Sequence, residues 1–303
     1  MTAESSINLP RISVIGFGEA GGIFARAFVA ASVPRVAVYD IKFETAEGAA
    51  MRRAATEAGA VPADSAAQAA LGADVVLAAV TASSALDAAT AAAGYIAPGQ
   101  VYLDINSVSP GTKRAAADRI ERAGGRYVEA AVMASVPPYG VRVPMLFGGP
   151  WARMLAERLQ PLGMQIEVFD REVGHVSAIK MCRSVMIKGI EALVVEAMTA
   201  AHEYAVEDQV LASLDETFPG LDWEKQAAYM AGRVVKHGKR RAEEMREAAK
   251  TVADIGLDPL MASATAERQQ WVADHVARDR FDGAKPTLAD IARVFRDQLK
   301  RGT

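Results

Sequence analysis

Three glycines near the start of the chain, Gly16, Gly18 and Gly21, have the spacing of a turn that holds a phosphate. They follow a β-branched run at residues 11–16 and precede an alanine-rich stretch that predicts a helix. In such a strand–turn–helix the first glycine permits a tight turn, the second lets a pyrophosphate approach the backbone, and the third lets the helix pack closely on the strand. The free N–H groups at the helix start favour the negative charge of the phosphates. By itself, this spacing is also compatible with an ordinary glycine-rich turn.

An acidic residue at the end of a second predicted strand, residues 35–40, narrows the ligand to a dinucleotide. Asp40 lies about 20 residues after the last glycine, where a carboxylate accepts hydrogen bonds from the adenosine ribose. A carboxylate there would repel a 2′-phosphate, so the sequence predicts NAD in preference to NADP. Lys42 leaves NADP as the alternative, and a strand-end turn residue is the structural alternative for Asp40. The predicted cofactor-binding residues are Gly16, Phe17, Gly18, Glu19, Ala20, Gly21, Asp40, Val80 and Thr81.

A polar stripe follows one face of a long apolar helical segment in the middle of the chain. Its members recur at three- or four-residue spacing and are Ser177, Lys180, Ser184, Lys188 and Glu191. An apolar helix is buried, so its polar residues must face a cavity, a ligand or paired partners. Burial and the positive charge of a nicotinamide both lower the pKa of a lysine, which makes Lys180 a candidate general base. A structural lysine that reaches solvent or pairs with Glu191 or another acid is the alternative.

Polar residues after another predicted strand, residues 101–105, could bind a substrate. Asn106 and Ser107 follow this strand at the carboxyl edge of the expected sheet, where doubly wound folds bind ligands. They are candidate hydrogen-bond donors to a substrate carboxylate or hydroxyl. The alternative is capping of the next helix, which Ser109 could do better.

Basic residues in the second half of the chain are further candidates. Arg183 could clamp a substrate carboxylate with its guanidinium group. His237 and Arg241 lie beside Gly238, where we expect one helix to end and another to begin. His237 is a candidate for binding substrate, but an exposed basic turn is the favoured interpretation of these two residues. Cys182 is expected to be a small buried residue with no activated thiol.

The first half of the chain alternates predicted strands with helical segments. The predicted strands are residues 11–16, 35–40, 74–80, 101–105, 127–132, 145–147 and 165–169. The predicted helices are residues 19–31, 44–58, 84–95, 110–123 and 151–162. This alternation predicts a Rossmann-type, doubly wound parallel sheet with helices on both faces.

The second half is predicted to be entirely helical. One long helical pattern covers residues 173–204, and shorter ones cover residues 223–237, 239–255, 259–277 and 288–299. We therefore expect an NAD-binding Rossmann domain at residues 1–172 and a helical substrate and dimerisation domain at residues 173–303. Five helices expose more apolar surface than one Rossmann face can cover, which predicts a homodimer or larger homo-oligomer. Candidates for the covered surface are Trp223, Tyr229, Met230 and Trp271.

Composition excludes several other classes of protein. With 51% hydrophobic and 23% charged residues and a net charge of −3, the chain is that of a soluble protein without attraction to nucleic acid or anionic lipid. Residues 1–10 lack the pattern of a signal peptide, and the single cysteine agrees with a cytoplasmic location. No apolar stretch is long enough to span a membrane. Four histidines and one cysteine, without ligand-like spacing, predict no metal site.

Beyond the glycine motif, the sequence resembles the β-hydroxyacid dehydrogenase superfamily, which includes 3-hydroxyisobutyrate and 6-phosphogluconate dehydrogenases. Residues 104–110 resemble its substrate-loop motif, Asp-x-Ser-Thr-x-x-Pro, and residues 145–149 resemble the stretch that closes its Rossmann domain. Residues 174–184 resemble its catalytic-helix motif, Gly-x-Gly-x-x-x-Lys-x-x-Asn-Asn, with Lys180 as the lysine. The resemblance implies hydride transfer between nicotinamide and the carbinol carbon of a β-hydroxyacid or related hydroxyl substrate. Lys180 would take the hydroxyl proton in oxidation and return it in reduction.

Three departures from the family pattern keep other functions open. Residues 129–135 stand where the family has Asp-Ala-Pro-Val-Ser-Gly-Gly, a segment whose turn holds the substrate carboxylate. Arg183 and Ser184 replace the two asparagines, and Ser184 stands where the second asparagine helps to hold substrate. These departures resemble a branch whose C-terminal helical domain has no assigned function. The alternatives are an imine or keto reductase, whose members commonly carry an acid or tyrosine in place of Lys180, and a catalytically silent dinucleotide-binding sensor or scaffold.

Overall fold

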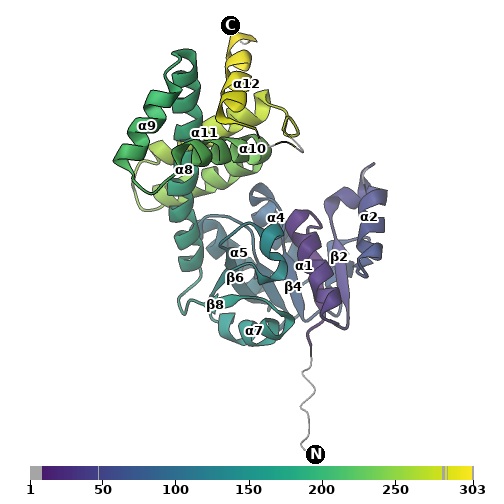
Figure 1. Ribbon diagram of the computed structural model, residues 1–303. Coiled ribbons are helices and arrows are strands. Elements are labelled where there is room, and N and C mark those ends of the chain that lie inside the picture. The colour runs from purple at the N-terminus through teal and green to yellow at the C-terminus, as the bar shows by residue number, and fades with distance from the viewer. Residues whose placement is uncertain (1–8, 47, 282–283, 285, 302–303) are drawn as a thin grey trace, which may run out of the picture. The chain divides into compact units, whose positions relative to one another are not determined.

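The computed structural model describes residues 9–46, 48–281, 284 and 286–301. The chain divides into two compact units, residues 1–180 and 181–303 (Figure 1). The division lies inside helix α8 (His175–Glu203), whereas the change in composition indicated a boundary after residue 172. Residues 1–8, which carry most of the segment searched for a signal peptide, lie outside the described residues.

The N-terminal unit, which we call the α/β unit, is built on an eight-stranded sheet in the order β3-β2-β1-β4-β5-β6-β7-β8. Neighbouring strands are parallel except for the antiparallel pair β6–β7. The strands are β1 (Ile12–Ile15), β2 (Val36–Tyr39), β3 (Val61–Pro62), β4 (Val75–Ala78), β5 (Val101–Asp104), β6 (Arg126–Val132), β7 (Met145–Gly148) and β8 (Ile166–Val168). The predicted doubly wound sheet is confirmed. Its strand order reverses between β1 and β4, and this is the point where such sheets bind ligands.

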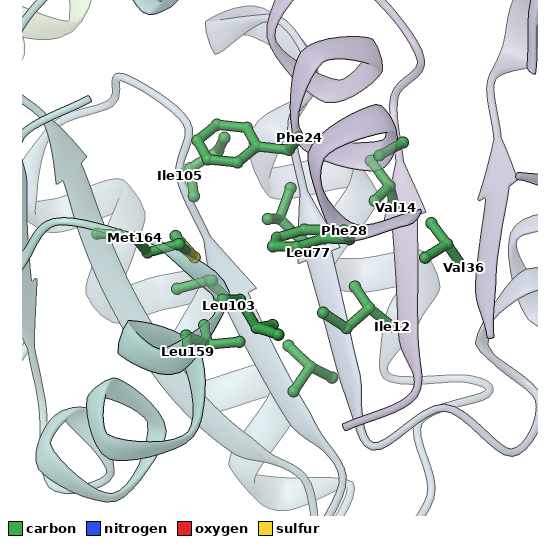
Figure 2. Close-up of a cluster of buried hydrophobic side chains, with 14 of the residues drawn as sticks. Ile12, Val14, Phe24, Phe28, Val36, Leu77, Leu103, Ile105, Leu159 and Met164 are labelled. Carbon is green, nitrogen blue, oxygen red and sulfur yellow. The ribbon is translucent and has the colours of Figure 1, made fainter. Parts of the chain in front are cut away.

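Helices cover both faces of the sheet because its strands are apolar on both sides. On β4, Val75 and Leu77 face one core while Val76 and Ala78 face the other. The first core packs against α1 (Glu19–Ala30) and α7 (Ala152–Leu159), and Figure 2 shows Phe24 and Phe28 of α1 beside Leu77. The second core packs against α3 (Ala66–Ala70), α4 (Ala85–Ala92) and α5 (Pro110–Arg122).

Short elements of this unit were not predicted. Strand β3 has two residues and ends the sheet at Pro62, a residue that strands tolerate mainly at an edge. Helix α3 has five residues and begins at Ser65, whose hydroxyl accepts from the backbone N–H of Gln68. Elements of this length carry too little periodicity to be recognised in the sequence. Helix α2 (Gly48–Glu57) agrees in place with a predicted helix.

The C-terminal unit, which we call the helical unit, contains the end of α8 followed by α9 (Glu207–Thr217), α10 (Trp223–Ala253), α11 (Leu260–His275) and α12 (Leu288–Arg301). The predicted helix end at Gly238 was wrong, because α10 continues through it. A Cβ at Gly238 would lie 2.8 Å from the backbone oxygen of Gln269 on α11. This glycine therefore permits close packing of two helices rather than ending one. Helix α9 was not predicted.

The helical unit buries its own apolar clusters. One cluster contains Val195, Val234, Val272, Ile291 and Phe295, and a second contains Met181, Met245, Ala248, Ala262 and Ala266. Three of the four residues expected on an interface are packed within this unit. Trp223 and Met230 lie against the cluster of Val194 and Met198, and Trp271 contacts Phe295. Tyr229, 56% exposed, is the fourth. Among the described residues, no helix is both long and apolar enough to cross a membrane.

Candidate functional site

The turn between β1 and α1 has the steric form of a phosphate-binding turn. A Cβ at Gly16, whose φ is +96°, would lie 2.3 Å from the backbone oxygen of Ala79 on the neighbouring strand connection. A Cβ at Gly21 would lie 1.9 Å from the backbone oxygen of Gly16. Gly18 has open space instead, with no atom within 4 Å of its Cβ position. Gly16 and Gly21 are thus required by the fold, and Gly18 leaves room for a ligand.

The start of α1 supplies hydrogen-bond donors at that open space. Gly18 is the N-cap of α1, and no side chain caps the helix there. The first N–H groups of a helix have no acceptor within it, and they carry the positive end of the helix dipole. Gly18 and Glu19 are exposed while Gly16 and Phe17 are buried. The residues present therefore fit the pyrophosphate of a dinucleotide.

Asp40 ties the end of β2 to this turn. One carboxylate oxygen accepts from the backbone N–H of Phe17 at 2.7 Å, and the other accepts from the N–H of Lys42 at 2.9 Å. Each carboxylate oxygen can accept a second hydrogen bond. Asp40 can therefore hold the turn and still accept from a ribose hydroxyl.

Asn106 contacts Val80, a predicted cofactor-binding residue, at the carboxyl edge of the sheet. Its Oδ1 accepts from the backbone N–H of Val80 at 2.7 Å, and a Cβ at Gly16 would lie 3.2 Å from the Val80 side chain. Thr81, the next residue, is exposed. The structure thus brings Gly16, Val80 and Asn106 together beside the point where the strand order reverses.

A buried network beneath Asn106 was missed in the sequence. Asp104 accepts from Asn106 Nδ2 at 2.7 Å, from Lys113 Nζ at 3.0 Å and from the Tyr127 hydroxyl at 2.7 Å. Burial raises the pKa of Tyr127 well above its ordinary value, and Asp104 adds to this, so the phenol stays a neutral donor. The available signal was Lys113, which shares the apolar face of its helix with Ala116 and Ala117.

Of the two serines after Asn106, Ser109 caps α5 and Ser107 does not. Ser109 Oγ accepts from the backbone N–H of Thr112 at 3.2 Å, so Ser109 caps α5, as the sequence indicated. Ser107 is half-buried between them. Asn106 and Ser107 are therefore not needed as caps.

Lys180 lies in the second turn of α8, at the end of the α/β unit, and is half-buried. The start of this helix is held by three hydrogen bonds. Glu129 on β6 accepts from the backbone N–H groups of Gly174 and Val176 at 2.9 and 3.0 Å, and Ser177 Oγ donates to the backbone oxygen of Gly174 at 3.0 Å. Ser177 of the polar stripe is thus a structural residue.

The rest of the stripe faces paired partners on α10. Lys188 Nζ lies 2.6 Å from a Glu244 carboxylate oxygen and 3.1 Å from Ser184 Oγ. Glu191 is paired with Arg241 and lies 3.8 Å from Arg233. Burial raises the pKa of Glu191, and Arg241 opposes that shift. The sequence left a cavity, a ligand or paired partners open for this stripe. Ser184, Lys188 and Glu191 face paired partners.

Two expectations for the second half of the chain were wrong. Cys182 is exposed, because it lies on the solvent side of α8 beside the exposed Arg183. His237 and Arg241 do not form an exposed basic turn. Arg241 is 3% exposed, and His237 is half-buried with a pKa lowered to about 4 by burial and by Arg240 and Arg241. Among the described residues, no group of three or more His, Cys, Asp or Glu side chains could hold a metal ion.

Two family models match separate parts of the chain. Residues 11–137 match the family described as the NAD binding domain of 6-phosphogluconate dehydrogenase. Residues 201–272 match a domain of unknown function (DUF1932). An uncharacterised 28.5 kDa protein of Methanothermus fervidus is 32% identical over 195 residues, which are 63% of this chain and 73% of that protein.

Two solved structures are similar over nearly the whole chain. A conserved hypothetical protein from Sinorhizobium meliloti 1021 is 40% identical, with a TM-score of 0.75 over 96% of this chain and 97% of that one. A 3-hydroxyisobutyrate dehydrogenase of Mycobacterium tuberculosis, solved with L-serine, is 19% identical, with a TM-score of 0.71 over 95% of this chain and 99% of that one. At 19% identity, the similarity to the Mycobacterium tuberculosis protein shows a shared fold.

Proposed function

The chain belongs to the β-hydroxyacid dehydrogenase superfamily, and we propose that it oxidises a hydroxyl group of a β-hydroxyacid or a related small molecule with NAD. The observation that carries the proposal is the β1–α1 turn, in which Gly16 and Gly21 are sterically required and Gly18 is open. Lys180 stands on the helix that follows the sheet, in the place of the lysine in the family motif.

NAD is proposed over NADP because of Asp40. Its carboxylate is fixed by the N–H groups of Phe17 and Lys42, so it cannot swing away from the end of β2 without losing both bonds. A 2′-phosphate placed there would meet a fixed negative charge. Calorimetry with both cofactors tests this preference, and tighter binding of NADP than of NAD would contradict it.

Lys180 is proposed as the group that moves the proton. A bound nicotinamide supplies the hydride acceptor. The Lys180 amine takes the proton of the substrate hydroxyl as the carbinol carbon loses its hydride, and it returns that proton when the reaction runs toward reduction. A lysine suits this role because its amine can exist in both protonation states, unlike a guanidinium group.

Ser107 is the better candidate than Asn106 for direct contact with the substrate. Asn106 is 4% exposed, its oxygen accepts from the Val80 N–H, and its amide nitrogen donates to Asp104. Asn106 therefore holds the edge of the sheet in shape. The half-buried Ser107 hydroxyl follows it at the same edge and can donate to a substrate carboxylate.

A homodimer or larger assembly remains our proposal for the quaternary state. Within the helical unit, Met186 and Leu193 are 64% and 56% exposed and lie two turns apart on one side of α8. Tyr229 adds a third exposed apolar side chain. Light scattering at micromolar concentration measures the mass, and a monomer would contradict the proposal.

A steady-state assay tests the proposed function. NAD reduction is followed with a panel of hydroxyacids, and reduced-cofactor oxidation is followed with the matching ketoacids and with cyclic imines. Turnover of one or more hydroxyacids is the expected result. Turnover of imines alone would indicate a reductase, and tight cofactor binding without any turnover would indicate a sensor or scaffold. Failure to bind either cofactor would overturn the proposal.

A further inference from the structure

Glu129 is a buried carboxylate that reaches from the sheet to the start of α8. It lies on β6, and its side chain is 0% exposed. One oxygen, Oε1, accepts from the N–H groups of both Gly174 and Val176, at 2.9 and 3.0 Å. Such N–H groups at a helix start have no acceptor inside the helix. Glu129 therefore caps α8 with a side chain that is distant in the sequence.

Two glycines make room for this contact. Gly148 on β7 pairs directly with Glu129, and a Cβ at Gly148 would lie 2.8 Å from Oε1. Gly174 has a φ of +108°, which residues with a side chain rarely adopt, and this conformation presents its N–H to the carboxylate. The absence of a side chain at Gly148 therefore leaves space for the Glu129 carboxylate between β7 and the helix start.

The capped residue shares a helix face with Lys180. Val176 and Lys180 are four residues apart, so their side chains lie one above the other on the same side of α8. Val176 is 1% exposed, and its side chain lies 2.8 Å from the Cβ position of Gly148. Fixing the N–H of Val176 to the sheet therefore fixes the rotation of the first turn, and with it the direction in which Lys180 leaves the helix.

We propose that Glu129 is a positioning residue for Lys180, acting through its two hydrogen bonds to the start of α8. Oε1 makes both bonds, whereas Oε2 is buried with no partner among the described residues. A glutamine can therefore replace Glu129 with its oxygen in the place of Oε1, and its amide nitrogen displaces no existing bond. The catalytic consequence rests on the proposed function, but the capping does not.

Hydrogen exchange of the backbone amides tests the capping without any substrate. In Glu129→Ala, exchange at residues 174–180 should accelerate by about 10-fold or more, because two buried N–H groups lose their acceptor. In Glu129→Gln, it should stay within about 3-fold of the wild type. Exchange in α1 is the internal control. Unchanged exchange in Glu129→Ala, or equal acceleration in both variants, would overturn the capping.

Kinetics on the accepted substrate test the positioning. Glu129→Ala should lower kcat by about 10- to 100-fold while the KM for the cofactor stays within about 2-fold, because the β1–α1 turn is untouched. Glu129→Gln should restore most of kcat. Ser177→Ala removes only a local bond to Gly174 and leaves the contact between the helix start and the sheet, so it is the matched control and should keep kcat. A kcat loss in Glu129→Gln equal to that in Glu129→Ala would overturn the positioning role. If the wild type turns over no substrate, the proposed function fails, and the exchange measurement still decides the capping.

Discussion

Asp104 in the α/β unit and Glu191 in the helical unit are both buried carboxylates, and their partners differ. Asp104 accepts hydrogen bonds from Lys113, from the neutral phenol of Tyr127 and from the amide of Asn106. Asn106 lies at the candidate site. Glu191 forms an ion pair with Arg241 and lies 3.8 Å from Arg233. Both arginines lie on α10. The first network shapes the edge of a sheet where a ligand would bind, and the second aligns two helices. We therefore expect the Asp104 network to support the candidate site and the Glu191 pair to support helix packing.

The largest expected effect separates catalysis from folding in the α/β unit. Lys180→Ala should lower the turnover rate by about 10²–10⁴-fold, the usual contribution of a positioned acid–base group. Cofactor affinity, measured by calorimetry, should stay nearly unchanged because, in the proposed function, the Gly16–Gly21 turn and Asp40 hold the cofactor. Lys180→Arg should not restore activity, since a guanidinium stays protonated at any working pH.

The pH dependence of the proposed reaction gives a second readout. The wild-type oxidation rate should rise with pH as Lys180 loses its proton, and that rise should vanish in Lys180→Ala. A variant that keeps most of its activity would move the base to another residue. A variant that fails to fold would make Lys180 a structural residue, like Ser177.

The helical unit should respond in the opposite way. Glu191→Leu leaves Arg241 buried without its partner, which should lower the free energy of unfolding by about 3–5 kcal/mol. The double variant Glu191→Leu/Arg241→Met should recover most of that loss, because apolar side chains can replace a buried ion pair. Urea unfolding followed by circular dichroism measures both. A single variant as stable as the wild type would contradict the packing role of this pair.

Smaller effects are expected at the glycines of the turn, on cofactor binding at Gly18 and on stability at Gly16. Gly18→Ala should weaken cofactor binding by about 10-fold, because its methyl group enters the space left for the pyrophosphate. Its melting temperature should hardly change. Gly16→Ala should instead destabilise the fold by about 2 kcal/mol or more, because its Cβ would meet Ala79 and its φ is positive. Equal loss of stability in both variants would show that Gly18 is also required by the fold.

The same contrast explains what could be predicted from the sequence. The β1–α1 turn is encoded by neighbouring residues, so its strand, glycines and helix were all recognised. The contact of Glu129 with Gly174 joins residues 45 positions apart, and that of Glu191 with Arg241 joins residues 50 positions apart. No local pattern identifies such partners. Gly238 was misread because a glycine that ends a helix and one that admits a neighbouring helix have the same local sequence signal.

The smallest expected effect concerns His237, in the middle of α10. Its pKa is lowered to about 4, first by burial and then by the nearby cations Arg240 and Arg241, with Arg233 and Lys236 adding to the shift. In the unfolded chain a histidine titrates near 6.5. Between these two values the unfolded state binds more protons than the folded one, so acidification favours unfolding. The contribution of His237 to the free energy of unfolding is therefore complete above about pH 6.5 and is lost as the pH falls toward 4.

His237 is half-exposed, so solvent screening reduces the effect to about 1–2 kcal/mol over that range. Urea unfolding of the wild type and of His237→Gln at about pH 7.5 and pH 5 measures it. The wild type should lose more stability than the variant on acidification, while the two should differ little at the higher pH. Equal losses in both proteins would mean that acid acts on other groups of the helical unit. A loss confined to the wild type would show that burial of His237, together with the nearby cations, keeps this histidine neutral in the folded protein.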